Sequence, residues 1–265
     1  AGLRYDHVRL ALADRFLSNG DQSGSLTFNE LNPMFGAVYS FNPAVNVYAN
    51  YATAFETPTF TEFSGSDDKT SFTQFDNAAA QRSRGFEVGV KGLVAARVRY
   101  ELAFYRTLVD DEVSTTTNIG GRAFFNNADT ERQGVELGIT TELLPRLVLT
   151  TTYTYSDLSF RRFNAVPGAV DQILPGMPQH VAYAELAYHH DTGWFARWDV
   201  QHAGSLYADN LNTVKVQSYN VSNLVFGKSF RYGTSTITPS FGVNNLFDER
   251  YFQDIHIEDS TRRYY

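Results

Sequence analysis

A two-residue alternation of apolar and polar side chains recurs along this chain and constrains its fold more than any other feature. In residues 86–90, for example, Glu87 and Gly89 separate three apolar side chains. Such alternation places one kind of side chain on each face of a β-sheet, and no stretch shows a convincing helical period. Eleven segments follow the pattern, at residues 2–17, 28–41, 44–55, 84–93, 97–109, 132–143, 147–158, 178–188, 194–204, 217–229 and 235–246. The sequence therefore predicts an all-β, antiparallel fold.

The connections between these segments alternate strictly between short and long. The short ones are residues 42–43, 94–96, 144–146, 189–193 and 230–234. The long ones are residues 18–27, 56–83, 110–131, 159–177, 205–216 and those from 247 onward. Outer-membrane barrels have this asymmetry, with short periplasmic turns and longer extracellular loops. Many segments also reach the roughly 9–11 residues that a tilted strand needs to cross a bilayer. We therefore expect an antiparallel transmembrane β-barrel.

The composition agrees with a membrane barrel and excludes several other classes. Charged residues make up 19% of the chain, below the roughly 25% that is usual for soluble domains. The 16 Tyr and 21 Phe residues would supply the aromatic girdles of a barrel. A net charge of -7 argues against a nucleic-acid-binding protein. A soluble lipocalin-like barrel also alternates, with its faces reversed, but eleven strands are many for it.

The number of predicted strands indicates that the barrel continues beyond this chain. Single-chain bacterial barrels have an even number of strands, whereas the eleven predicted here end in a long connection. A sheet with open edges is not viable in lipid, because its backbone groups would lack hydrogen-bond partners. We therefore expect the chain to be a piece of a larger barrel, with earlier strands and a closing strand outside it.

Several short motifs carry a resemblance to one family. They are GLRYD at residues 2–6, VYANYATAFETPT at 47–59, RGFEVG at 84–89, RQGVELG at 132–138, LPGMPQH at 174–180 and GVNNLFDERY at 242–251. Together, and in this order, they resemble the C-terminal half of the β-barrel of a TonB-dependent outer-membrane receptor. The last motif, which resembles the exit of the family's penultimate strand, is the most specific.

The resemblance implies a fold, a function and a set of partners. It implies a 22-stranded barrel whose lumen holds a plug domain, in the outer membrane of a Gram-negative bacterium. Residues 1–265 would be the C-terminal portion of that barrel domain, with the plug and the closing strand absent from the chain. The function implied is the import of a scarce, bulky nutrient, foremost a ferric siderophore. The implied partners are the protein's own plug and, through it, TonB with ExbB and ExbD.

Other functions stay open at this point. A passive porin-type channel would need neither plug nor energy coupling. Residues 55–59, together with residues 18–24, resemble receptors proposed to import pyrroloquinoline quinone, so a non-siderophore cofactor is an alternative substrate. An outer-membrane enzyme would need a catalytic set at the barrel mouth, and a soluble β-rich binding module would need no membrane.

No motif predicts catalysis, a bound metal or a cofactor. Gly227-Lys228-Ser229 lacks the preceding glycine of a P-loop. His189 and His190 fall in a short turn, where solvated side chains are the simpler interpretation. The acidic run 110–112 lacks the ligand spacing of a calcium loop. Loop surface, or contact with lipopolysaccharide through bridging cations, explains this run better. We expect a protein that is not an enzyme.

Ligand contacts are expected in the long outer loops. Arginine can pair with the carboxylates of a chelate through two hydrogen bonds, and aromatic rings stack on flat ligands. The candidates are Arg122, Phe124, Phe125, Arg161, Arg162, Phe163, Tyr207, Arg262 and Arg263.

A second set of charged residues is expected to face the lumen. An Arg or Lys that faces lipid at mid-depth costs roughly 2–4 kcal/mol, so charged positions within strands belong on the inner face. In a plugged barrel these side chains would hydrogen-bond the plug. The set is Glu87, Arg97, Arg99, Glu101 and Glu136.

Overall fold

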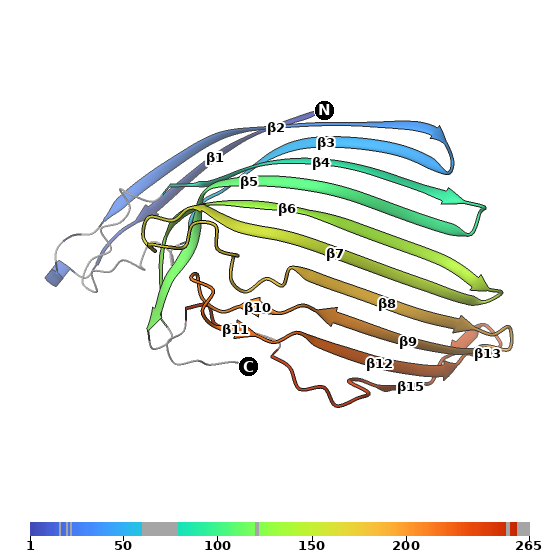
Figure 1. Cartoon of the computed structure of the whole chain (residues 1–265). Helices are drawn as coiled ribbons and strands as arrows, with labels where there is room; N and C mark the ends of the chain where they lie inside the picture. The colour runs from blue at the N-terminus through green and yellow to red at the C-terminus, as the bar shows by residue number, and fades with distance from the viewer. Residues whose placement is uncertain are drawn as a thin grey trace.

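The structure, a computed structural model, describes residues 1–15, 17–19, 21, 23–59, 79–119, 122–252 and 255–258. Its main feature is one curved, eleven-stranded antiparallel sheet in which each strand lies beside its neighbour in sequence (Figure 1). The strands are β1 (Gly2–Leu12), β2 (Gly24–Asn42), β3 (Val45–Glu56), β4 (Gln81–Val94), β5 (Val98–Ile119), β6 (Arg122–Leu144), β7 (Leu147–Arg162), β8 (His180–His189), β9 (Trp194–Ala203), β12 (Tyr219–Lys228) and β15 (Ser240–Val243).

The eleven predicted antiparallel strands are confirmed. Most connections also alternate as predicted, with short turns at one end of the sheet, which we call the turn end, and long connections at the other, the loop end (Figure 1). The exceptions are residues 120–121, which are all that separates β5 from β6 at the loop end, and residues 229–239, which separate β12 from β15 at the turn end. Within the described residues the sheet is not closed, since β1 and β15 are its two edges. None of the described residues forms a helix long and apolar enough to cross a membrane.

The largest error of the sequence prediction concerns residues 110–131, which were expected to be a long connection. In the structure β5 continues to Ile119 and β6 begins at Arg122, so nearly all of this stretch is a β-hairpin. Polar residues such as Asp110, Thr115 and Asn127 hide the alternation there. The two arms extend beyond the ends of β4 and β7 at the loop end, where a strand needs no apolar face against lipid.

Smaller differences occur at the other connections. A 3-10 turn, η1 (Leu17–Asn19), follows β1, which ends earlier than predicted. The connection 205–216 contains a small hairpin of β10 (Leu206–Tyr207) and β11 (Lys215–Val216). The last predicted strand is divided into β14 (Ser235–Ile237), which pairs with β13 (Phe230–Tyr232), and β15. Pro239 lies between β14 and β15, where a residue without a backbone N–H interrupts a strand.

The two faces of the sheet differ in chemistry as the alternation predicts. On the convex face the rings of Phe86 and Phe104 are 52% and 50% exposed, as expected for a surface that a bilayer covers. On the concave face, Glu87, Glu101 and Glu136 line a cavity of about 390 Å³. A polar concave face and an apolar convex face are the arrangement of a membrane barrel wall.

On the concave face, the side chain of Tyr48 lies across a glycine of the next strand. The Tyr48 ring of β3 covers Gly89 of β4, and a Cβ atom at Gly89 would lie 2.5 Å from that ring. The Tyr48 hydroxyl continues over β4 to donate a hydrogen bond to Glu101 on β5, at 3.2 Å. Position 89 therefore requires glycine, because the Tyr48 ring approaches its backbone so closely. The Tyr48 side chain thus contacts β4 and β5 from β3.

Candidate functional site at the loop end

The connection after β7 folds back onto that strand and builds the main apolar core of the chain. Its backbone pairs with β7: the Asp171 N–H donates to the Phe160 carbonyl at 2.9 Å, and the Leu174 N–H donates to that of Leu158 at 2.9 Å. Phe163, only 2% exposed, stacks on Phe160 with ring centroids 5.0 Å apart. This connection is thus held in one conformation against the concave side of β6 and β7. The cluster comprises Ala128, Leu158, Phe160, Phe163, Ala169 and Leu174.

The turn at residues 209–212, between β10 and β11, fastens two other segments. The Asn212 side-chain amide makes two hydrogen bonds with the backbone of Ile173, one accepted from N and one donated to O, both 2.8 Å. Asn210, which is 1% exposed, donates from Nδ2 to the Thr115 carbonyl of β5 at 2.8 Å. The 209–212 turn therefore connects the loop after β7 to the outer part of the β5–β6 hairpin.

A fourth segment, residues 255–258, joins the same assembly through Glu258. The Glu258 carboxylate accepts a hydrogen bond from the Asn210 N–H at 2.6 Å. The Glu258 N–H donates to the Ala208 carbonyl at 2.9 Å, and the Glu258 carbonyl accepts from the Asn118 N–H at 3.1 Å. Burial raises the pKa of the Glu258 carboxyl above its ordinary value. We call these four segments, which lie around residues 115–118, 158–174, 208–212 and 255–258, the loop-end assembly.

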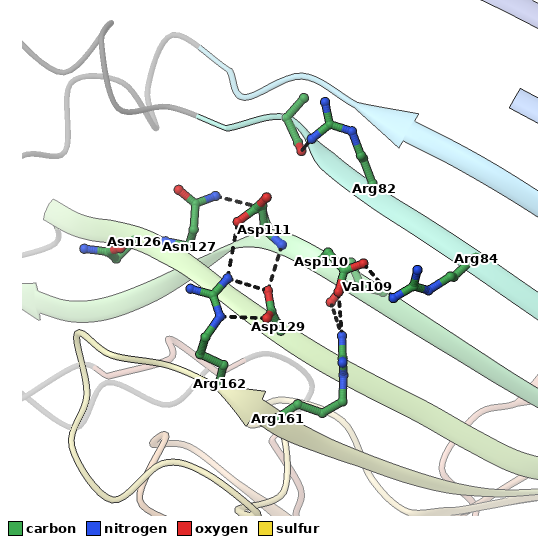
Figure 2. Close-up of polar contacts among 11 residues, drawn as sticks. Arg82, Arg84, Val109, Asp110, Asp111, Asn126, Asn127, Asp129, Arg161 and Arg162 are labelled. Atoms are coloured by element: carbon green, nitrogen blue, oxygen red, sulfur yellow. Dashed lines mark hydrogen bonds and ion pairs between the residues drawn. The ribbon is translucent and has the colours of Figure 1, made fainter. Parts of the chain in front are cut away.

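A cluster of acidic and basic side chains lies where the β5–β6 hairpin leaves the sheet (Figure 2). The register of β5 with β6 shifts between Val109 and Glu112, so Asp110 and Asp111 form a bulge opposite Asp129. Asp111 has a positive φ of 57°, and its N–H donates to Asp129 Oδ1 at 3.1 Å. The bulge therefore brings three carboxylates together.

Two arginines from the end of β7 neutralise these carboxylates. Arg162 pairs with Asp129 through two hydrogen bonds of 2.7 and 2.8 Å and approaches Asp111 at 3.4 Å. Arg161 reaches across β6 to Asp110 at 2.7 Å (Figure 2). The hydrogen bonds from Arg162 hold the pKa of Asp129 below its ordinary value. We call Asp110, Asp111, Asp129, Arg161 and Arg162 the bulge cluster.

The bulge cluster lies on the convex face of the sheet, opposite the polar concave face. Along β6, Asp129 shares a face with every second residue up to Val135, which pairs with the convex Phe104. Arg162 pairs with Asp129 and so projects from that same face. The predicted ligand candidates Arg161 and Arg162 are thus strand residues on the outside of the sheet, not loop residues.

Of the other predicted ligand candidates, the structure describes the side chains of Phe125, Phe163 and Tyr207. Phe163 is buried in the apolar core, and Tyr207 lies in β10, where its carbonyl accepts from the Gly176 N–H at 2.8 Å. Phe125 lies in β6 and is partly exposed. Arg122 and Phe124 also belong to β6, but their side chains, like the whole of Arg262 and Arg263, lie outside the described residues.

Four of the five residues expected to face the lumen line cavities on the concave face. Glu87, Glu101 and Glu136 line the concave cavity described above. Arg99 lines a neighbouring concave cavity of about 490 Å³, nearer the turn end. Arg97 differs from the expectation, because it lies in the turn between β4 and β5 rather than in a strand.

Several contacts of the loop end escaped the sequence analysis. Asn210, Asn212, Asp129 and Glu258 form its main polar connections, yet short Asp and Asn runs occur in most turns. Nothing in a single sequence indicates which distant segment such a turn contacts. In the part of the chain that the structure describes, no group of three or more His, Asp or Glu side chains is arranged so that it could hold a metal ion.

Comparisons with known proteins agree with this geometry. The family model described as "TonB dependent receptor-like, beta-barrel" matches residues 1–246. The chain is 24% identical over 256 residues to the ferrioxamine B receptor of Salmonella typhimurium, covering 94% of this chain and 34% of that protein. It is 26% identical over 261 residues to the metal-pseudopaline receptor CntO of Pseudomonas aeruginosa, covering 95% of this chain and 35% of CntO.

A solved structure shows the same fold. The unliganded ferric citrate transporter FecA superposes with a TM-score of 0.82 at 17% identity, covering 99% of this chain and 40% of FecA. The curved antiparallel sheet, with its apolar convex face and polar concave face, thus defines one wall of a transmembrane β-barrel. The chain belongs to the TonB-dependent receptor β-barrel family. It spans about a third of the length of the curated relatives it matches.

Proposed function

We propose that the protein to which this chain belongs is an outer-membrane receptor that imports a bulky metal chelate, foremost a ferric siderophore, with energy supplied through TonB. The observation that carries the proposal is the family match over residues 1–246. The names of two relatives support the substrate class, because ferrioxamine B and metal-pseudopaline are both metal chelates. The proposed location is the outer membrane of a Gram-negative bacterium, with the loop end facing outward.

In this proposal residues 1–265 form part of the barrel wall, and the plug and the remaining strands belong to other parts of the protein. The concave face is then the wall of the lumen. Glu87, Glu101 and Glu136, which line one cavity on it, are the proposed contacts for basic side chains of the plug. TonB, ExbB and ExbD would act through that plug.

The two faces of the loop end receive different proposed partners. The ligand would approach from the concave side, where Tyr207 and Phe125 lie in the loop-end connections, and Arg122, Phe124, Arg262 and Arg263 remain proposed contacts by sequence alone. The convex face above Phe86 carries charged side chains such as Arg84 and Arg106, which are 53% and 59% exposed. This surface would meet the phosphates and bridging cations of lipopolysaccharide.

The test is uptake of radioactive iron by a strain that lacks the gene, complemented with the whole receptor. Hydroxamate, catecholate and carboxylate siderophores are supplied one at a time, with and without inactivation of TonB. We expect uptake of at least one chelate that disappears when TonB is inactivated. Uptake that persists without TonB would favour a passive channel, and uptake of none of the chelates would contradict the substrate class.

A further inference from the structure

The outer part of the β5–β6 hairpin extends beyond both neighbouring strands. β4 pairs with β5 only as far as Asp110, and β7 pairs with β6 only as far as Asp129. Beyond these residues the arms, 111–119 and 122–128, form strand pairs only with each other. Figure 1 shows the end of β5 turning away from the direction of the sheet and across the loop end toward β10 and β11.

The turn in direction begins at the bulge. A β-bulge bends its strand and increases the local twist, and the two-residue bulge at Asp110 and Asp111 lies at the start of the free arms. The register of β6 with β7 shifts at the same level, between Asp129 and Thr130. Irregularities in two adjacent strand pairs therefore coincide, and together they direct the hairpin over the concave side.

The bulge cluster spans this bend. From β7, Arg161 donates to the Thr130 carbonyl of β6 at 3.2 Å and to the Asp110 carboxylate of β5 at 2.7 Å. Arg162 connects β7 to Asp129 of β6 and to Asp111 of β5. Arg84 of β4 also pairs with Asp110, at 3.2 Å, but without the two β7 arginines the three neighbouring carboxylates would carry excess negative charge and repel one another across the bend. Each guanidinium therefore connects three strands at the point where the hairpin changes direction.

The far part of the hairpin is fixed independently. Asn210 donates a hydrogen bond to the Thr115 carbonyl, and the Asn118 N–H donates one to the Glu258 carbonyl. These contacts join β5 to segments that follow β9 and β15, on the other side of the loop end. The hairpin is thus held both at its bend and near its tip, and it lies across the outer end of the concave face.

We propose that Arg161 and Arg162 are positioning residues, which hold the β5–β6 hairpin bent across the ligand entrance of the barrel, rather than residues that contact the ligand. The Asn210 and Glu258 contacts secure the same hairpin near its tip. This inference rests on the proposed function only in naming the loop end as the ligand entrance. The position of the hairpin can be measured without any ligand, so the inference can fail while the uptake proposal stands.

The experiment measures the distance between two spin labels in the whole receptor, on a background whose only cysteines are Asn126→Cys on the hairpin and Lys215→Cys on β11. We expect a narrow, short distance in the otherwise unchanged protein. In the Arg161→Ala/Arg162→Ala variant we expect a clearly broader distance distribution, because the bend loses its ion pairs while only the Asn210 and Glu258 contacts still hold the hairpin near its tip. Arg162→Lys added to intact Arg161 keeps both charges and should retain most of the peak.

Two further variants keep the result decisive. Arg146→Ala removes an arginine that pairs with Asp191 at the turn end, and it should leave the distance unchanged. If the double arginine variant does not assemble, Asp129→Asn removes the charge that Arg162 pairs with at almost constant volume, and it should broaden the distance distribution. A distribution that stays narrow and short in the double arginine variant, or in Asp129→Asn, would overturn the proposal.

Discussion

The wall of the barrel and the loop-end assembly are stabilised in different ways. Between the turn end and the bulge, β4 and β5 pair without a single register shift, and the side chains simply alternate between lipid and lumen. The register of β5 with β6 shifts at the bulge and once more beyond it, and individual side chains such as Asn210 and Asn212 bind the backbone of distant segments. The wall therefore depends on a repeated pattern, and the loop end on a few specific contacts.

This difference predicts which substitutions each region tolerates. In the wall, away from close approaches such as that of Tyr48 to Gly89, a position should accept most side chains of the polarity of its face. The damaging change there is a side chain with the polarity of the opposite face. At the loop end, the loss of one amide or carboxylate should loosen a whole segment, while the strands in the membrane stay intact.

The largest effect is expected from a charge on the convex face of the wall. Leu102 lies on β5 between the convex residues Tyr100 and Phe104, and Leu102→Arg should destabilise the folded receptor by roughly 2–4 kcal/mol, as for arginine near the bilayer midplane. Equilibrium unfolding in lipid vesicles measures this. Thr152→Arg, on the concave face, is the matched control and should cost much less. Equal costs at both positions would contradict the assignment of the faces.

The next effect concerns the 209–212 turn. Asn210→Ala removes a buried side chain that donates a hydrogen bond to the partly buried Thr115 carbonyl, which should cost about 1–3 kcal/mol locally. Hydrogen exchange should accelerate at Asn118 and Glu258, while the amides of β4 and β5 within the wall keep their protection. Asn220→Ala, which breaks the hydrogen bond of 2.9 Å between Asn220 and His202 on β12 and β9, is the control and should leave Asn118 protected. Protection of Asn118 that survives Asn210→Ala would show that the assembly has another support.

A smaller effect is expected from the bulge cluster. Asp129→Asn removes the charge that Arg162 binds, and the cost should be about 1 kcal/mol, because Arg162 is half-exposed and solvent screens the pair. Because Arg162 holds the pKa of Asp129 low, the ion pair stabilises the bend fully above the ordinary aspartate pKa. This stabilisation is lost as the pH falls through the lowered value.

The measurement is hydrogen exchange at Asp111, whose N–H donates to Asp129. In the unchanged protein, exchange should accelerate on acidification, after correction for the intrinsic rate. The exchange rate at Asp111 in the Asp129→Asn variant should not depend on pH in this range. High salt should screen the Arg162–Asp129 pair and so also accelerate exchange at Asp111 in the unchanged protein. A pH dependence that persists in Asp129→Asn would assign it to another group.

The smallest effect is expected from Glu258, with the opposite sign. Burial raises the pKa of this carboxyl, so the docked segment binds its proton more tightly than an extended chain does. Docking should therefore weaken as the pH rises from the ordinary glutamate pKa through the raised value. Hydrogen exchange at Asn118, whose N–H donates to the Glu258 carbonyl, reports this, and Glu258→Gln should make it insensitive to pH in that range. Faster exchange at lower pH would contradict the prediction.

The strands of the wall could be predicted from the sequence because the alternation of apolar and polar residues repeats in every strand and involves only neighbouring residues. Residues 86–90 alternate in the sequence, and Phe86 and Glu87 do lie on opposite faces of the sheet. The prediction failed at residues 110–131, where strands continue outside the membrane and no longer need alternating polarity. It also placed Arg161, Arg162 and Phe163 together in a long connection, whereas Arg161 and Arg162 belong to β7 and Phe163 is in the apolar core.

A period of two and the length of each connection act on neighbouring residues, so they specify the antiparallel sheet, its strand order and the chemistry of its two faces. The meeting of Asn210 with Thr115, 95 residues away in sequence, and of Arg162 with the bulge in β5 follows instead from the three-dimensional arrangement of the strands. Such contacts depend on the curvature of the sheet and on where two bulges bend a hairpin. Polar side chains of this kind can pair with many partners, so their identity alone does not specify which one they reach.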